Sequence, residues 1–254
     1  MNNVTESGLG LTIPAYRNDV QREVDVIEEI LRVYGYNNIK FSHKLNSSIS
    51  FNINKEVTLE NSIANQLTNL GFNETMANSL TKEEYITFSE NLKSEFNVTM
   101  LNPLSNELKV MRQSLLFSGL ESISYNINRK NSSLKLYEFG KTYHKYEKGY
   151  QEDKHLSLFV SGAKTKDSWT HVSKNSDFFY LKGIVMSILE RIGVTNLKTS
   201  PVKSDLFSEG IVFSLGKNKL VEFGVINKRV LKEFGIKQEV LFADFDWRSL
   251  NEIS

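Results

Sequence analysis

The amino-acid sequence predicts an α+β protein whose main domain is built on a largely antiparallel β-sheet. Stretches with helical and with strand-like apolar spacing interleave along the chain instead of alternating in regular βαβ units. Strand-like stretches also follow one another through short turns, such as the one at Lys217 and Asn218, which is typical of hairpins. With 254 residues, 40% of them hydrophobic, the chain is long enough to bury a substantial core.

A helix is predicted near the start of the chain, within residues 16–36. Asn18 can cap its first turn, with Gln21 three residues further on, and Gly35 can end it. The apolar residues recur at steps of four and three, so they share one side of the helix, which requires a partner surface. They are Val20, Val24, Ile27, Leu31 and Tyr34.

The other side of this helix is acidic. Asp25, Glu28 and Glu29 stand at i, i+3 and i+4, and Asp19 lies at the helix entrance. One interpretation is a solvated acidic face, since Glu28 and Arg32 have the spacing of a helical ion pair. The other is a site for a hard cation such as Mg²⁺, which prefers oxygen ligands. Spacing alone does not decide between them.

The next segments are a linker and a second helix. Residues 37–54 are rich in Asn, Ser and Lys, which indicates a linker. The helix that follows Thr58 is expected to end at Gly71. Its inward face holds Ile63, Leu67 and Leu70.

The remaining elements follow in chain order. A helix over residues 114–128 is expected to bury Leu115, Leu116, Leu120, Ile123 and Ile127. A strand over residues 134–146 contains Gly140, which suggests a β-bulge. The others are a helix over 82–88, an extended segment over 97–103, a strand over 155–162, a helix over 177–192, a helix over 228–234 and a final strand over 240–245.

Composition limits the classes of function. The 31 basic and 30 acidic residues give no broad positive field for non-specific nucleic-acid binding. The absence of cysteine excludes a disulfide framework, a zinc-thiolate site and a cysteine nucleophile, and it fits a reducing compartment. Because the sequence shows no signal peptide and no apolar run of about 18 residues, we expect a cytoplasmic protein without a membrane span.

Three motifs resemble one known family. The run IPAYRNDVQREVDVIEEILRVYGYNNI, residues 13–39, resembles the end of the B5 domain of bacterial phenylalanyl-tRNA synthetase β chains. The run LNPLSNELKVMRQSLLFSGLESISYNINR, residues 101–129, resembles a second segment of the same family, although Glu121 replaces the second leucine of the usual pair. The start DFFYLKG, residues 177–183, is also typical of it. Together the matching segments span nearly the whole chain.

This resemblance implies a fold and a domain division. Residues 1–40 would be the C-terminal part of a B5 domain, residues 41–54 a linker, and residues 55–254 a class II aminoacyl-tRNA synthetase-like domain of the B6/B7 region. It also implies a Mg²⁺ site formed by four acids of the opening segment. Position by position these are Asp19, Asp25, Glu28 and Glu29.

The resemblance further implies a role within a larger ligase. The chain would be a scaffold fragment of the β subunit, and an α subunit would supply the active site that uses ATP to attach phenylalanine to tRNA(Phe). The implied assembly is an α2β2 heterotetramer. On this interpretation the chain is part of an enzyme and is inactive alone.

The residues themselves favour a catalytically silent domain. Adenylate chemistry needs guanidinium groups on the ATP phosphates, yet the strand over residues 134–146 contains no arginine. Its cations are Lys135, Lys141 and Lys145, which lack the planar fork. The segment EFGVINKRVL does not have the glycine-to-arginine spacing of the third synthetase motif. The histidines are scattered without metal-ligand spacing; they are His43, His144, His155 and His171.

Two other interpretations remain open. The first is a free-standing module that binds tRNA or another nucleic acid through a patch of Arg112, Arg129, Lys130 and Lys141. The second is an independent small-molecule ligase, which would need a bound nucleotide that the missing arginines do not favour.

Overall fold

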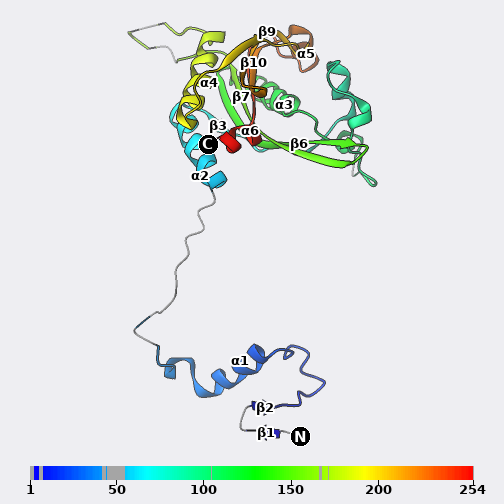
Figure 1. Ribbon diagram of the computed structural model, residues 1–254, viewed down its shortest axis with the longest axis vertical. Helices are drawn as coiled ribbons and strands as arrows, with labels where there is room; N and C mark the ends of the chain where they lie inside the picture. The colour runs from blue at the N-terminus through cyan, green and yellow to red at the C-terminus, as the bar shows by residue number, and fades with distance from the viewer. Residues whose placement is uncertain are drawn as a thin grey trace. The chain divides into compact units, whose positions relative to one another are not determined.

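A computed structural model describes residues 3–5, 8–41, 44, 55–103, 105–165, 168–170 and 172–253. The chain divides into two compact units, Met1–Asn52 and Ile53–Ser254, which are described separately (Figure 1). The linker predicted over residues 37–54 falls largely on residues outside the described ones. Among the described residues, no helix has both the length and the apolar character that a membrane crossing requires.

The first unit contains a short hairpin and one α-helix. Strands β1 (Asn3–Thr5) and β2 (Gly8–Gly10) pair antiparallel, and they are followed by α1 (Glu23–Tyr34) and a 3-10 turn (Tyr36–Asn38). Gly35 ends α1 as predicted: its φ is 92° and its N–H donates to the Leu31 carbonyl at 2.8 Å.

The predicted start of this helix is wrong. The N-cap is Arg22 and not Asn18. The Asp25 carboxylate accepts the backbone N–H groups of Gln21 at 3.1 Å and Arg22 at 2.8 Å, and this fixes the first turn. Asn18 instead accepts, through its carbonyl, a hydrogen bond from the Gln21 side chain.

The apolar side of α1 is largely uncovered in this unit. Val20 is buried, but Val24, Ile27 and Tyr34 are about half exposed. No residue of α1 itself is buried. The predicted stripe therefore exists as a pattern on the helix, and little of the described first unit packs against it.

The second unit is built on a seven-stranded sheet in the order β3-β6-β7-β11-β10-β9-β8. Every neighbouring pair is antiparallel except β3 with β6. This confirms the predicted α+β class with a largely antiparallel sheet. The strands are β3 (Asn73–Glu74), β6 (Leu134–Tyr146), β7 (Gly149–Ser161), β8 (Lys198–Pro201), β9 (Phe207–Leu215), β10 (Asn218–Ile226) and β11 (Val240–Asp246).

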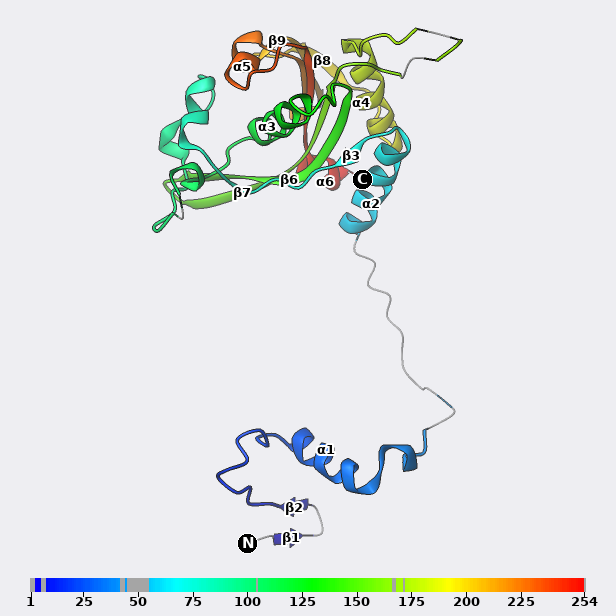
Figure 2. The same ribbon diagram turned by 180° about the vertical axis from the view of Figure 1, so that it is seen from behind.

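Helices cover both faces of this sheet (Figures 1 and 2). One face packs against α2 (Lys55–Asn69), α4 (Phe178–Ile192) and α6 (Trp247–Ile253), and the other against α3 (Leu116–Ile127) and α5 (Lys228–Glu233). A minor sheet pairs β4 (Leu80–Thr81) with β5 (Val110–Met111). Short 3-10 turns occupy Glu83–Phe88, Ser94–Phe96 and Asn106–Leu108.

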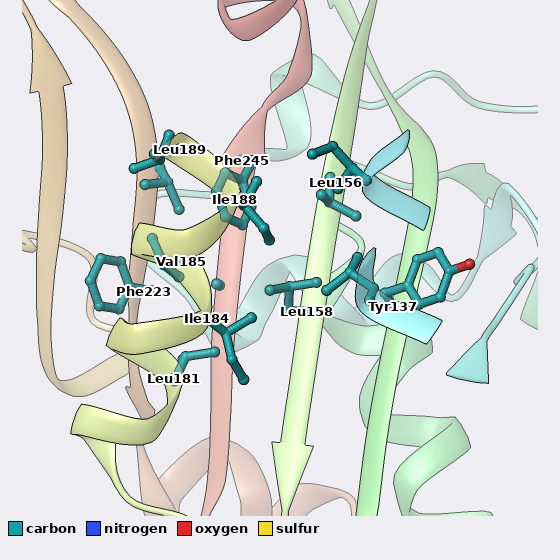
Figure 3. Packing of buried hydrophobic residues seen from close by; sticks show 14 of the residues in the cluster. Tyr137, Leu156, Leu158, Leu181, Ile184, Val185, Ile188, Leu189, Phe223 and Phe245 are labelled. Carbon is teal, nitrogen blue, oxygen red and sulfur yellow. The ribbon is translucent and has the colours of Figure 1, made fainter. Parts of the chain in front are cut away.

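The larger core lies between the sheet and α4. Leu181, Val185 and Ile188 of α4 belong to one buried cluster with Leu158 and Phe245 of the central strands, and Figure 3 shows α4 lying against these strands. These residues are fully buried, and burying a Leu, Ile or Phe side chain is worth about 1.5–3 kcal/mol. The helix is fixed at its start, because the Asp177 carboxylate accepts the Tyr180 N–H at 2.8 Å.

The predicted elements of the second unit are mostly confirmed, but several details differ. Leu70 is 41% exposed rather than inward, because α2 ends at Asn69 before another turn can bury it. The segment over 97–103 contributes only an isolated bridge, from Thr99 to Val110. Strand β7 begins at Gly149, earlier than predicted, and α6 was not predicted.

Gly140 does not form a bulge. It pairs in register with His155, and the register of β6 and β7 is unbroken from Leu134 to Tyr146. The glycine is required for space: a Cβ there would lie 2.4 Å from Nη2 of Arg112 and 2.6 Å from Cδ2 of Leu115. The glycine allows the guanidinium of Arg112 to cross over strand β6.

Candidate functional site

The four acids predicted as Mg²⁺ ligands occupy three environments. Asp25 serves the start of α1 through the hydrogen bonds described above. Asp19 and Glu29 both contact one nitrogen of Arg17, whose Nη2 lies 2.8 Å from Asp19 Oδ2 and 2.8 Å from Glu29 Oε1. Glu28 pairs with Arg32 at 2.8 Å, as its spacing predicts.

The electrostatics of this cluster follow from these contacts. Hydrogen bonding to Arg17 lowers the pKa of Asp19, and the backbone N–H groups of Arg22 and Gln21 lower the pKa of Asp25. In return, Asp19 and Glu29 raise the pKa of the Arg17 guanidinium. Asp19 and Asp25 are therefore anionic at neutral pH, as ligands of a hard cation must be.

The fit of this cluster to a metal ion is partial. Carboxylate oxygens are the right chemistry for Mg²⁺, and the Arg17 guanidinium already places a positive charge between Asp19 and Glu29. However, the described residues contain no group of three or more acidic or histidine side chains arranged to hold a metal ion. Asp25 is turned to the backbone of its own helix start.

Arg112 contacts strand β6 and is buried inside the domain. Arg112 precedes α3, and its Nη1 donates to Glu138 Oε1 at 2.7 Å while its Nε donates to the Lys141 carbonyl at 2.9 Å. The side chains of Arg112 and Glu138 are 5% and 2% exposed. Burial raises the pKa of Glu138, and the adjacent guanidinium partly offsets that rise.

Three of the four cations considered from the sequence as a nucleic-acid patch have partners within the domain. Arg112 forms an ion pair with Glu138, and Lys141 forms one with Glu152 at 2.6 Å. Arg129 lies over the ring of Tyr125, with 3.4 Å between its Cζ and the ring centroid.

A polar network on the α3 side of the sheet was missed by sequence reasoning. Asp244 of β11 pairs through Oδ1 with His155 Nδ1 at 3.1 Å and accepts the Ser157 hydroxyl at 3.1 Å. The other ring nitrogen of His155 lies 3.1 Å from the Thr142 hydroxyl. The available signal was alternation: His155 and Ser157 share one face of β7, and Asp244 interrupts the apolar run VLFADFD.

The charges in this network are coupled. Burial opposes the charged form of the His155 ring, but the Asp244 carboxylate outweighs burial and raises the pKa of His155. Burial likewise opposes ionisation of Asp244, and His155 lowers its pKa. The pair is therefore best described as an ion pair that both partners favour.

A cleft of about 420 Å³ opens on the same side of the sheet. Its polar lining includes Asn91, Gln113, Ser114, Lys203, Lys219, Glu222 and Asp244. Lys219 is paired with Glu222 at 2.8 Å. No arginine is found among the described residues that line it, so the cleft offers two carboxylates and no guanidinium fork.

Glu121, where the chain departs from the family motif, has a local partner. Its carboxylate accepts a hydrogen bond from the hydroxyl of Tyr85. Burial raises the pKa of that hydroxyl, and Glu121 reinforces the rise.

Comparison with known proteins identifies the sequence family. Residues 25–247 match the family described as "Phenylalanyl tRNA synthetase beta chain CLM domain". Residues 1–36 match the family "tRNA synthetase B5 domain".

Curated relatives carry one name, "Phenylalanine--tRNA ligase beta subunit". The protein of Bacteroides thetaiotaomicron is 45% identical over 262 residues, covering 98% of this chain and 32% of the relative. That of Bacteroides fragilis is 43% identical, covering 97% and 32%. That of Porphyromonas gingivalis is 36% identical, covering 94% and 31%. The chain thus spans about a third of the length of these relatives.

Two solved structures share the fold. A structure titled as Desulfitobacterium hafniense PylSc, a pyrrolysyl tRNA synthetase, has a TM-score of 0.60 at 16% identity and covers 78% of this chain and 68% of its own. A second structure, of pyrrolysyl-tRNA synthetase from the same organism, has a TM-score of 0.60 at 14% identity, with 96% and 82% covered. At these identities the likeness shows the fold alone, and it is the predicted class II synthetase-like fold. The match over residues 25–247 shows that the chain belongs to the phenylalanyl-tRNA synthetase beta chain family, an aminoacyl-tRNA ligase family.

Proposed function

We propose that the chain acts as a scaffold for the α subunit of a phenylalanine–tRNA ligase and is itself catalytically silent. The α subunit would carry out the ATP-dependent attachment of phenylalanine to tRNA(Phe). The observation that carries the proposal is the buried ion pair of Arg112 with Glu138. This guanidinium lies on the α3 side of the sheet, the side on which the cleft opens, and it is paired with the buried carboxylate of Glu138.

The charges of the cleft support this proposal. A nucleotide triphosphate needs cations that are not already neutralised. The cleft presents Glu222 and Asp244, and its Lys219 is paired with Glu222. Strand β6 adds lysines but no arginine. Asp244 in turn is paired with His155, so among the described lining residues Lys203 is the one cation without a described carboxylate partner, and the cleft has little positive charge to offer a triphosphate.

Silence is tested by phenylalanine-dependent ATP–pyrophosphate exchange. The chain alone is expected to give no exchange above a buffer blank. Robust exchange by the chain alone, with phenylalanine and ATP both required, would contradict the proposal.

The partner and the assembly belong to the same proposal. An α chain from the same organism is expected to form a stable complex with this chain, in a ligase with α2β2 composition that acts on tRNA(Phe) in the cytoplasm. Family membership and the relatives' shared name support this. Co-expression with only one chain tagged tests it, with the tagged α chain expected to retain this chain through a size-exclusion column.

We also propose the domain division implied by the family motifs: residues 1–40 as the end of a B5 domain, 41–54 as a linker and 55–254 as the synthetase-like core. The matched ranges and the two compact units support it. Limited proteolysis tests it, since the first cuts are expected within residues 41–54.

Mg²⁺ at the acids of the first unit remains a proposal. Asp19, Asp25, Glu28 and Glu29 supply suitable oxygen ligands, and Arg17 and Arg32 compete for three of them. Calorimetric titration of the complex with Mg²⁺ tests it. Asp25→Ala, Glu29→Ala should abolish binding, and Arg17→Ala should strengthen it. Equal Mg²⁺ binding by the wild type and the double variant would contradict the proposed metal site.

A further inference from the structure

A cavity of about 400 Å³ lies at the β3 edge of the large sheet, apart from the cleft described above. It is formed by the turn after α2, the start of β6 and the segment that follows β7. Its polar lining residues are Asn73, Ser133, Lys135, Lys164, Thr165 and Ser173. No acidic residue occurs among the described residues that line it.

Two lysine side chains converge at this cavity. The Nζ atom of Lys135 lies 5.1 Å from the ring centroid of Tyr180, and that of Lys164 lies 4.9 Å from the same centroid. The two ammonium groups are therefore at most 10 Å apart. The tyrosine ring stabilises both cations by cation–π attraction, which holds them near each other in spite of their mutual repulsion.

These two lysines differ in their partners from two paired lysines of the same domain, Lys109 and Lys141. Lys109 pairs with Glu83 at 2.5 Å, and Lys141 pairs with Glu152 at 2.6 Å. Among the described residues, by contrast, no carboxylate lies within ion-pair distance of Lys135 or Lys164. Lys135 donates to the Leu70 carbonyl at the end of α2 at 3.3 Å, a contact that positions its charge without neutralising it.

Neutral donors complete the lining. The Ser133 hydroxyl oxygen accepts the Ala163 N–H at 3.1 Å, which orients it and leaves its proton for a ligand oxygen. The Asn73 side chain adds amide N–H groups. Charged and neutral donors thus surround a space that lacks a described negative group.

We propose that this cavity binds a phosphate group. A phosphate carries negative charge on several oxygens and so can accept from two ammonium groups and a hydroxyl at once. Two lysines at most 10 Å apart can also contact neighbouring phosphates of a single-stranded RNA. The shared chemistry is the phosphate oxygen, and its source is either a free phosphate species or an RNA backbone.

The test uses the full chain and two probes in parallel. Uniformly ¹⁵N-labelled protein is titrated at low salt with inorganic phosphate and, separately, with an oligouridylate that lacks terminal phosphates. We expect amide resonances of Ser133, Lys135, Ala163 and Lys164 to shift in a saturable way. Shifts with phosphate alone identify a free phosphate species, and shifts with the oligouridylate identify an RNA backbone; either supports the proposal.

Variants locate the binding. Lys164→Ala is expected to weaken binding about 3- to 10-fold, because one of two cationic contacts is lost. Lys135→Ala should weaken binding similarly. Lys164→Glu should abolish binding while leaving intact the hydrogen bond from Lys135 to the Leu70 carbonyl. Lys174→Ala is the matched control, since Lys174 lies opposite Lys164 in the same segment but does not line the cavity.

Salt dependence sharpens the RNA arm. If the two lysines neutralise two phosphates, the slope of log affinity against log salt is about −1.4 for the wild type and about −0.7 for Lys164→Ala. Absence of saturable shifts with both probes would overturn the proposal. So would a loss of affinity in Lys174→Ala as large as that in Lys164→Ala, because it would show diffuse charge attraction and no site.

Discussion

Replacing Arg112 by methionine tests the role assigned to the buried ion pair. The substitution keeps much of the side-chain volume and removes the charge, so it leaves Glu138 without its partner in a site where that side chain is 2% exposed. Removing one partner of a buried pair costs about 3–5 kcal/mol of the free energy of unfolding. We expect a loss in this range at pH 8.

The loss should depend on pH in a defined direction. Burial raises the pKa of Glu138 above its usual 4.5, so the folded state holds this proton more tightly than the unfolded chain does. Its contribution to stability is therefore present below pH 4.5 and is lost as the pH rises through the native pKa. Without Arg112 the native pKa rises further, so the difference from wild type should grow from pH 5 to pH 8.

Urea unfolding followed by tryptophan fluorescence measures this loss. Trp247 is fully buried in the second unit and Trp169 is 97% exposed, so a Trp169→Phe background isolates the buried reporter. The control is Arg112→Met, Glu138→Leu, which removes both charges and should recover most of the loss. A loss below about 1 kcal/mol, or one of equal size at pH 5 and pH 8, would refute the reasoning.

Three further predictions follow from single contacts. Gly140→Ala should lower the free energy of unfolding by about 1–3 kcal/mol, because its Cβ would overlap the guanidinium of Arg112. Gly183→Ala, with open space around its Cβ, should raise the free energy of unfolding by about 0.5–1 kcal/mol. Urea unfolding compares the two variants, and equal effects would contradict the packing argument. His155 should titrate above its usual pKa of 6.5, and Asp244→Asn should lower that pKa, because burial is then opposed only by the weaker attraction of Asp246 and Asp153. NMR of the imidazole protons measures both pKa values, and an unchanged pKa in the variant would contradict the coupling. Because the raised pKa makes this pair stabilising below about pH 6.5 and less so as the pH rises through the native pKa, the wild type should lose its advantage over Asp244→Asn at high pH. Asp25→Ala should reduce the helicity of α1, because the cap that the Asp25 carboxylate forms is worth about 1 kcal/mol. Glu23→Ala should not reduce it, because the Glu23 side chain forms no described cap. Circular dichroism of the chain measures the difference.

Local patterns were sufficient to predict most elements of the second unit. Strand β6 has the predicted bounds, because its alternation, flanking polar residues and lack of proline all agree. Gly35 ends α1 as predicted, because a φ above zero is a property of one residue and its neighbours. Asp177 was predicted as the first residue of its helix and is the N-cap, one position before α4. Helix α6 was missed because its seven residues follow directly on β11 without a separating turn signal.

Features that depend on distant residues were not predictable. Gly140 suggested a bulge, yet glycine is required there because a Cβ would overlap the side chain of Arg112, which lies 28 positions earlier in the sequence. The network of His155 and Asp244 joins strands that are neighbours only in the folded sheet. Likewise, spacing identified the acids of α1 but could not show that Arg17 lies between Asp19 and Glu29.

Reconstitution with a matching α chain tests the scaffold role most directly. Phenylalanine-dependent ATP–pyrophosphate exchange is measured for each chain alone and for the complex recovered by size exclusion. We predict a stable complex, no exchange by this chain alone, and exchange in the complex that is unchanged by substitutions in the Glu222 and Asp244 cleft that preserve folding. Failure of the two chains to associate, or exchange by this chain alone, would contradict the account.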